Sequence, residues 1–249
     1  MSRGPGVALC GRRAFVTGGA NGIGAAVCER LAGDGAQVVF ADIDKAAANA
    51  LCARIEATYL HLDLCDGREL RAGMAASGPF DILINSAGVD QHAWFTDSDP
   101  EDWERLIGIN LTAVLTATHA ALPAMQAAGY GRIVNIASEA GRMGSRGAAV
   151  YAAAKGGVLA FTRSIARENA RKGITANAIA PGPIDTPMVQ RAVAVGGARL
   201  MDAMTGATLI GRMGLPSEVA AAVAFLVSSD ASFITGETLG VSGGMGCGQ

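Results

Sequence analysis

The sequence predicts an α/β fold in which a parallel sheet of about seven strands carries helices on both faces. Three observations lead to this prediction. Short apolar, β-branched runs alternate along the chain with longer segments of helical periodicity. The runs are apolar almost throughout, which is typical of strands buried on both faces. A glycine-rich turn joins the first run to the first helical segment, so that strand and helix can follow each other closely.

The strands follow the apolar runs, and they are expected at residues 13–17, 37–41, 59–62, 82–85, 132–137, 174–179 and 238–241. Helices are expected at residues 22–32, 44–57, 102–128 and 148–172, with a final helix from Pro216. Pro123 is expected to bend or end the helix over 102–128. Residues 186–211, rich in Met, Ala and Gly, are expected to form a ligand-gating loop, or a plain surface loop with a short helix.

The chain is expected to fold as one domain. Its 249 residues would suffice for one large domain or two small ones. No Pro- or Ser-rich linker divides the sequence, and no internal repeat is present. With the alternation of strands and helices, this predicts a single doubly wound, Rossmann-type domain over residues 1–249, with a flexible N-terminus over about residues 1–10.

Composition excludes several classes of protein. Half of the residues are hydrophobic and 17% are charged, which excludes a disordered chain. The net charge of -2, without a basic stripe, argues against nucleic acid as a partner. Five cysteines without CxxC spacing predict neither disulfides nor a metal site, and they fit a reducing cytoplasm. We expect neither a secretory signal at residues 1–11 nor a membrane span, since no run of about 18 uncharged apolar residues is evident.

The glycine-rich turn has the sequence TGGANGIG over residues 17–24. A pyrophosphate needs the free N–H groups and partial positive charge of a helix N-terminus, and residues without Cβ that let backbone and phosphate approach closely. The turn offers both. The alternative is a turn whose glycines only let a helix pack against a strand. Its place after the first strand, with an acid after the second, favours a dinucleotide site.

That acid is Asp42. A carboxylate at the tip of the second strand accepts hydrogen bonds from an adenosine ribose and repels a 2′-phosphate. Neither Asn21 nor Ile43 supplies the cation that a 2′-phosphate would need. The expected cofactor is therefore NAD, and Asp44 is expected to cap the next helix.

Tyr151 and Lys155 stand four residues apart near the start of a long helix, so they share one face of it. A neighbouring ammonium lowers the pKa of a tyrosine from about 10, which makes the phenol usable as an acid or base near neutrality. Ser138 directly follows a strand, where its hydroxyl can fix a carbonyl or alcohol oxygen in the crevice beyond the sheet. The plainer alternatives are an amphipathic surface pair and a helix-capping serine.

Several motifs occur together in chain order: TGGANGIG at 17–24, NSAG at 85–88, Asn110, Ser138, YAAAK at 151–155 and PGPIDTP at 181–187. In this combination the chain resembles the short-chain dehydrogenase/reductase family in its compact single-domain form, over about residues 11–244. One departure is Ser86, where the family usually has a second asparagine. The resemblance implies an oxidoreductase that interconverts a secondary alcohol and a ketone by hydride transfer with a nicotinamide.

The resemblance also implies a role for each matching residue. Tyr151 would be the general acid in reduction and the base in oxidation, Lys155 would lower its pKa and bind the nicotinamide ribose, and Ser138 would bond the substrate oxygen. Asn110 would support a water-linked proton path to Lys155, the alternative being a buried helix asparagine. Besides Tyr151 and Lys155, the cofactor would lie against Gly18, Asn21, Gly22, Ile23, Gly24, Asp42, Asp63, Leu64, Asn85, Ala87, Gly88, Pro181, Gly182, Ile184 and Thr186.

Within the family, residues 102–186 resemble 3-oxoacyl reductases and 2-hydroxycyclohexanecarboxyl-CoA dehydrogenases. This implies a small-molecule substrate, either a β-hydroxy or β-keto acyl compound or a cyclic alcohol, held by Ser138 and Tyr151. The candidate pocket walls are residues 89–95, 139–146 and 188–204. Within them the candidate residues, each equally expected as an ordinary packed or solvated residue, are Glu139, His92, Trp94, Met143 and Met188. Arg142 and Arg146 either bind a carboxylate or phosphate of the substrate or are solvated charges.

Two other functions stay open. A non-catalytic module could use this fold to sense NAD, but it would be expected to lose the proton-transfer residues that are present here. An NADPH-dependent 3-oxoacyl-carrier reductase is the nearer alternative, against which Asp42 argues. The resemblance further implies a homotetramer, in which the two long helices would pair across subunits.

Overall fold

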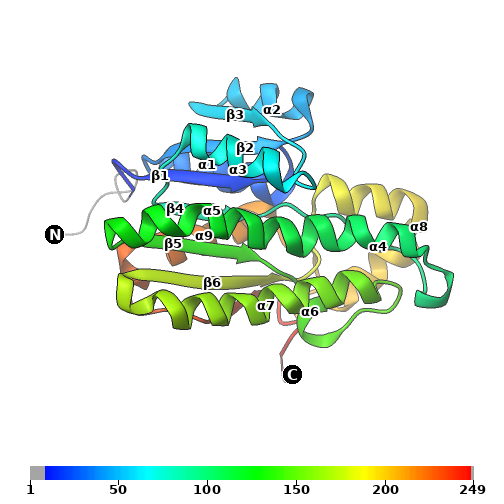
Figure 1. Cartoon of the computed structure of the whole chain (residues 1–249). Coiled ribbons are helices and arrows are strands. Elements are labelled where there is room, and N and C mark those ends of the chain that lie inside the picture. Colours follow the sequence, from blue (N-terminus) through cyan, green and yellow to red (C-terminus); the bar gives the residue numbers. More distant parts are fainter. Residues whose placement is uncertain (1–8, 248–249) are drawn as a thin grey trace.

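The computed structural model describes residues 9–247, and its strands form one parallel sheet in the order β3-β2-β1-β4-β5-β6-β7 (Figure 1). The strands are β1 (Arg13–Thr17), β2 (Gln37–Asp42), β3 (Ala57–His61), β4 (Ile82–Asn85), β5 (Gly131–Ile136), β6 (Ile174–Pro181) and β7 (Thr238–Val241). The predicted α/β fold is confirmed, because every expected strand is present and strand ends differ by no more than two residues.

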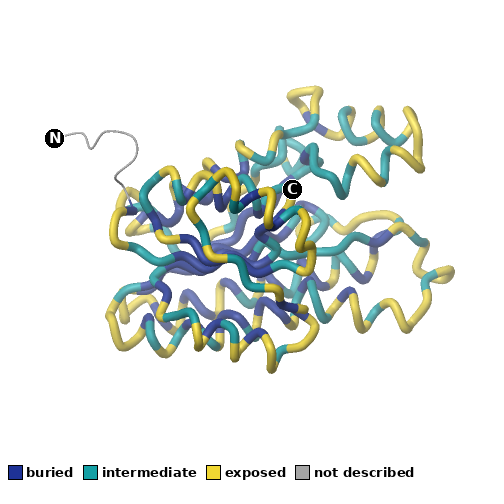
Figure 2. Tube along the Cα trace, turned by 90° about the horizontal axis from the view of Figure 1, so that it is seen from above, coloured by how far each residue is buried: buried dark blue, intermediate teal, exposed yellow. Residues whose placement is uncertain are grey.

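Helices cover both faces of the sheet. One face carries α1 (Gly22–Gly33), α2 (Lys45–Cys52) and α9 (Pro216–Val227), and the other carries α3 (Gly67–Ser77), α4 (Pro100–Ile107), α5 (Ala113–Ala128), the short α6 (Ala140–Met143) and α7 (Ala149–Asn169). In Figure 2 the buried residues gather along the strands between these layers, and the exposed ones lie on the outer faces of the helices.

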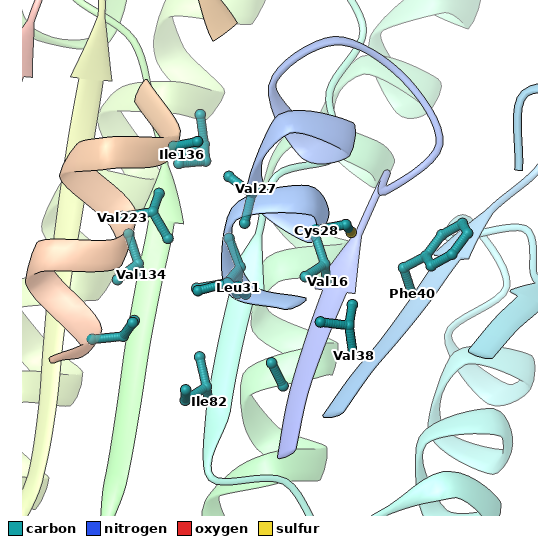
Figure 3. Packing of buried hydrophobic residues seen from close by; sticks show 14 of the residues in the cluster. Val16, Val27, Cys28, Leu31, Val38, Phe40, Ile82, Val134, Ile136 and Val223 are labelled. Carbon is teal, nitrogen blue, oxygen red and sulfur yellow. The ribbon is translucent and has the colours of Figure 1, made fainter. Parts of the chain in front are cut away.

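Successive side chains of each strand point to opposite faces and so divide the core in two. Val16 and Val134 pack against Leu31 of α1 and Val223 of α9, and Figure 3 shows this cluster. Phe15, the neighbour of Val16, belongs to the separate cluster formed with α3, α5 and α7. Both faces of the sheet are therefore buried, as the unbroken apolar runs predicted.

Several helices differ from the prediction. The helix expected at 44–57 ends at Cys52, because the chain must turn before β3 begins at Ala57. Pro123 lies inside α5 on its exposed side, and α5 continues to Ala128 because its buried face, including Ala121 and Met125, packs on the sheet.

The segment expected to be a loop at 186–211 is mostly helix α8 (Pro187–Gly206). The hydroxyl of Thr186 caps it by accepting a hydrogen bond from the N–H of Val189, and Pro187 occupies the first turn. Gly197, with φ 67°, interrupts the helical geometry and divides α8 into two parts.

The long helix expected at 102–128 contains a π-turn, Gly108–Thr112, between α4 and α5. By length and composition alone, the whole stretch Pro100–Ala128 meets the criteria for a membrane span. Its buried residues, however, pack on the sheet and on α3.

Of the N-terminal residues expected to be flexible, residues 1–8 lie outside the described part of the chain. Leu9 is buried, and its N–H donates to the carbonyl of Asp34 at 3.0 Å. Cys10, Cys28, Cys52, Cys65 and Cys247 are free thiols.

Candidate active site

A cavity of about 690 Å³ lies at the carboxyl ends of the strands. Its lining includes most of the residues predicted to bind the cofactor: Gly18, Asn21, Gly22, Ile23, Gly24, Asp42, Asp63, Leu64, Ala87, Gly88, Pro181, Gly182, Ile184 and Thr186. Ser138, Tyr151 and Lys155 line the same cavity, together with Glu139 and Met188. The structure thus brings the glycine-rich turn and the proposed proton-transfer residues into one space.

Other candidate residues lie outside this lining. Asn85 is buried between strands, where its Nδ2 donates to Asn135 Oδ1 at 2.8 Å, so its side chain supports the sheet. Trp94 is exposed, and His92 is half exposed and paired with the carboxylate of Asp90 at 3.1 Å. Met143 ends the short helix α6.

Glu139 is buried although it carries a carboxylate. Its Oε1 lies 3.5 Å from Nη1 of Arg142, and its Oε2 has no hydrogen-bond partner among the described residues. Both Arg142 and Arg146 are exposed, and neither lines the cavity. The structure therefore does not place a substrate-binding arginine at the positions that the sequence suggested.

The glycine-rich turn has the shape that a pyrophosphate requires. Gly18 has φ +66°, and a Cβ there would lie 2.7 Å from the Cα of Ala87. A Cβ on Gly24 would lie 2.0 Å from the carbonyl oxygen of Gly18. Asn21 precedes α1 without capping it by its side chain, which donates to Asp44 at 3.1 Å instead. The helix N-terminus thus faces the cavity without a side-chain cap, and the residues present fit a dinucleotide.

Asp42 ends β2 at the rim of the cavity, as expected. Its Oδ2 accepts a hydrogen bond from the N–H of Ala20 at 2.9 Å, and its Oδ1 accepts one from the N–H of Asp44 at 3.0 Å. Asp44 caps α2 as predicted, and the N–H of Ala47 holds the pKa of its carboxyl below the usual value. Two backbone bonds fix the Asp42 carboxylate, and each of its oxygens keeps a lone pair for a ribose hydroxyl.

Lys155 and Tyr151 project from the first turns of α7. The Nζ of Lys155 donates to the carbonyl of Ile136 at 2.9 Å and lies 5.8 Å from the centre of the Tyr151 ring. A Cβ on Gly88 would lie 3.4 Å from that Nζ and 3.0 Å from Oδ1 of Asn110. Gly88 therefore lets the lysine and the asparagine approach each other.

Asn110 is fully buried in the π-turn. Its Nδ2 donates to the carbonyl of Leu106 at 3.0 Å and to that of Val89 at 2.9 Å, and its Oδ1 accepts from the N–H of Val89 at 3.3 Å. A π-turn disrupts the regular helical ladder, and the side chain of Asn110 supplies the carbonyl of Leu106 with a donor. Asn110 lies outside the cavity lining but directly behind Gly88.

The pKa of Tyr151 differs from the sequence prediction. Burial, the largest effect, and the charge of Asp90 together raise it to about 12, against the opposing effect of a hydrogen bond with Ser138. The Nζ of Lys155 lies 5.8 Å from the centre of the ring and donates to the carbonyl of Ile136. Burial also lowers the pKa of Lys155 itself to about 8, against the opposing effect of Asp90. The phenol is thus a neutral donor at physiological pH.

Gln91, Asp90 and Arg191 lie within the predicted wall segments 89–95 and 188–204, but the sequence interpretation gave none of them a role of its own. Gln91 is buried, and its side-chain carbonyl accepts hydrogen bonds from the N–H groups of Val150 and Tyr151 at 3.0 and 3.2 Å. Asp90 and Arg191 line the cavity. The spacing of the catalytic motif gives no sign of Gln91, because its hydrogen-bond partners lie 59 and 60 residues away in the sequence.

Comparisons with known proteins agree with this geometry. A family model described as enoyl-(acyl carrier protein) reductase matches residues 18–246. The chain is similar to the acetoacetyl-CoA reductase of Rhizobium meliloti, with 42% identity over 239 residues, 94% of this chain and 98% of that protein. It is also similar to the 3-oxoacyl-(acyl-carrier-protein) reductase of Vibrio cholerae, with 39% identity over 247 residues, 95% of this chain and 98% of that protein.

Among solved structures, a protein described as a candidate gluconate dehydrogenase from Agrobacterium tumefaciens has a TM-score of 0.91 at 31% identity, covering 97% of this chain and 98% of that chain. These matches span nearly the whole sequence.

Proposed function

The chain belongs to the short-chain dehydrogenase/reductase family of oxidoreductases, and we propose that it interconverts a secondary alcohol and a ketone with NAD(H), using Tyr151 as general acid and base. The observation that carries this proposal is the convergence of Ser138, Tyr151 and Lys155 in the cavity that also holds the glycine-rich turn.

The proposed mechanism assigns one task to each residue. The hydroxyl of Ser138 donates a hydrogen bond to the substrate oxygen and holds it against the phenol of Tyr151. In reduction Tyr151 passes its proton to that oxygen, and in oxidation the phenolate takes the proton back. The ammonium of Lys155 stabilises the phenolate as it forms. When bound, the nicotinamide supplies or accepts the hydride.

NAD is favoured over NADP by the charges around Asp42. This carboxylate is fixed by two backbone N–H groups, and Asp44 stands beside it. A 2′-phosphate would meet two negative charges there. Arg191 also lines the cavity, and the chain is similar to a 3-oxoacyl reductase, which makes the NADPH-dependent 3-oxoacyl reductase the second candidate.

The proposed substrates are β-keto or β-hydroxy acyl thioesters. The support is the similarity to reductases of acetoacetyl-CoA and of 3-oxoacyl carrier protein. We propose a homotetramer as well, from the family resemblance, and a monomer at all concentrations in sedimentation would refute it.

The test is steady-state turnover of acetoacetyl-CoA with NADH and with NADPH. The proposal predicts turnover with both reductants and a higher kcat/KM with NADH. A higher kcat/KM with NADPH would favour the second candidate. Binding of NADH without turnover of any secondary alcohol or β-keto compound would point instead to a sensing module.

A further inference from the structure

The loop that follows β4 is tied to the start of the catalytic helix α7. Gln91 lies in this loop and is 7% exposed. Its Oε1 accepts a hydrogen bond from the N–H of Val150 at 3.0 Å and another from the N–H of Tyr151 at 3.2 Å. Beside it, the N–H of Ala93 donates to the carbonyl of Gly147 at 3.0 Å. Three hydrogen bonds thus join this loop to the chain that enters α7.

The first turn of α7 has no cap of its own. Ala148 occupies the N-cap position, and an alanine side chain cannot accept a hydrogen bond. The N–H groups at the second and third positions of a helix are those that an N-cap side chain ordinarily satisfies. In α7 these are the N–H groups of Val150 and Tyr151, and Gln91 satisfies both from a distant part of the sequence.

The same loop is held at its other end by Asn110. The amide of Asn110 bonds both the N–H and the carbonyl of Val89, two residues before Gln91. The loop between Val89 and Gln91 is therefore fixed at one end to the π-turn and at the other to α7. A chain of hydrogen bonds thus connects Asn110 through this loop to the backbone of Tyr151.

We propose that Gln91 is a positioning residue for Tyr151, which sets the place of the phenol through the first turn of α7. Gln91 does not line the cavity, so it acts through the backbone and not by contact with substrate or cofactor. The inference rests on the proposed role of Tyr151 as the proton donor. A displacement of a reacting group by about 1 Å can cost about a hundred-fold in rate, so a loosened first turn would lower kcat.

The test compares Gln91→Met with Gln126→Ala. Met keeps most of the volume of Gln91 but removes the amide oxygen. Gln126 is a matched control, because it also bridges to α7, through a 2.7 Å bond from its Nε2 to Asn169 at the far end of the helix. We expect Gln91→Met to lower kcat for ketone reduction at least about ten-fold, with the KM for NADH within about two-fold of the parent. Gln126→Ala should keep kcat within about two-fold of the parent, whatever it does to Tm.

Gln91→Glu supplies the rescue arm, because a carboxylate oxygen can accept both N–H groups and a negative charge is favourable at a helix N-terminus. It should recover most of the lost kcat. If kcat of Gln91→Met stays within about two-fold of the parent, or if kcat follows Tm across all three variants, the inference is wrong.

A measurement on the parent protein keeps the inference testable if Gln91→Met does not fold. The amide protons of Val150 and Tyr151 should exchange with solvent more slowly than those of Ile23 and Gly24, in the first turn of α1, which has no side-chain cap. Equal or faster exchange would contradict it. Tyr151→Phe, measured alongside, separates the two proposals. Retained turnover in that variant overturns the proposed function, whereas its loss with an unaffected Gln91→Met overturns only the role of Gln91.

Discussion

Lys155 donates a hydrogen bond of 2.9 Å from its Nζ to the backbone carbonyl of Ile136. This bond anchors the lysine to the carboxyl end of β5, two residues before Ser138. The strand end thereby sets the positions of both side chains relative to Tyr151. The cost is a fully buried ammonium, whose pKa burial lowers to about 8.

Lys155→Met should stabilise the protein while abolishing most of its activity. A pKa displaced from 10.5 to about 8 means that the fold holds the ammonium at a cost of roughly 3 kcal/mol below pH 8. Loss of the bond to Ile136 offsets about 1 kcal/mol, so the free energy of unfolding at pH 7 should rise by about 2 kcal/mol.

The predicted gain in the free energy of unfolding can be checked by urea denaturation of the parent and Lys155→Met at several pH values. Between pH 8 and 10.5 the parent releases the proton of Lys155 in the folded state before the unfolded state does, so its stability rises with pH. The advantage of the variant should therefore shrink over this window. A stability advantage of the variant that grows between pH 8 and 10.5 would contradict a lowered pKa for Lys155 in the folded protein.

Turnover should fall as the pH rises above about 8, because the charged form of Lys155 stabilises the phenolate. Asp90 raises the pKa of Lys155, so Asp90→Asn should move this alkaline limb to lower pH. A pH–rate profile of kcat for both proteins checks the prediction. A limb that stays in place in Asp90→Asn would mean that another group controls it.

Cofactor choice should depend on Asp42. The double variant Asp42→Ala, Ile43→Arg removes a carboxylate and places a cation at Ile43, an exposed residue that lines the cavity. The ratio of kcat/KM for NADH to that for NADPH should fall by about ten-fold or more. In Ile43→Arg alone, this ratio should lie between those of the parent and the double variant. An unchanged ratio in the double variant would contradict the proposal that Asp42 selects NAD.

Gly24→Ala should weaken cofactor binding. The added Cβ would lie 2.0 Å from the carbonyl oxygen of Gly18, so the glycine-rich turn must shift. We expect the Kd for NADH to rise at least about ten-fold by fluorescence titration. Gly33→Ala is the control in the same helix, since a Cβ there meets nothing within 4 Å. Equal affinities for NADH in the two variants would contradict the proposal that the glycine-rich turn binds the cofactor.

The sequence allowed the sheet, the glycine-rich turn and the cavity at the carboxyl ends of the strands to be predicted because their signals are local. An apolar run of five residues such as β1 has few alternatives to a buried strand, and glycines at a strand–helix junction imply close approach. The carboxyl ends of parallel strands meet at one edge, so Ser138 and Asp42 could be placed there without coordinates.

The features that were missed depend on distant residues. The cap on α7 comes from Gln91, whose partners lie 59 and 60 residues away. The π-turn at Asn110 is held by a side chain that bonds Val89 across the fold. The richness in Met, Ala and Gly over residues 186–211 indicated a loop, whereas most of the segment is helix and only Gly197 leaves the helical geometry. The burial that raises the pKa of Tyr151 also arises only in the folded chain.

The central claim is that Tyr151 transfers the proton. The most direct test is the kcat of Tyr151→Phe for ketone reduction at pH 7, with NADH binding verified by fluorescence in the same sample. General acid catalysis of this kind contributes about 10²- to 10⁴-fold, so kcat should fall at least about a hundred-fold while the Kd for NADH changes little. A kcat within a few-fold of the parent would contradict the account.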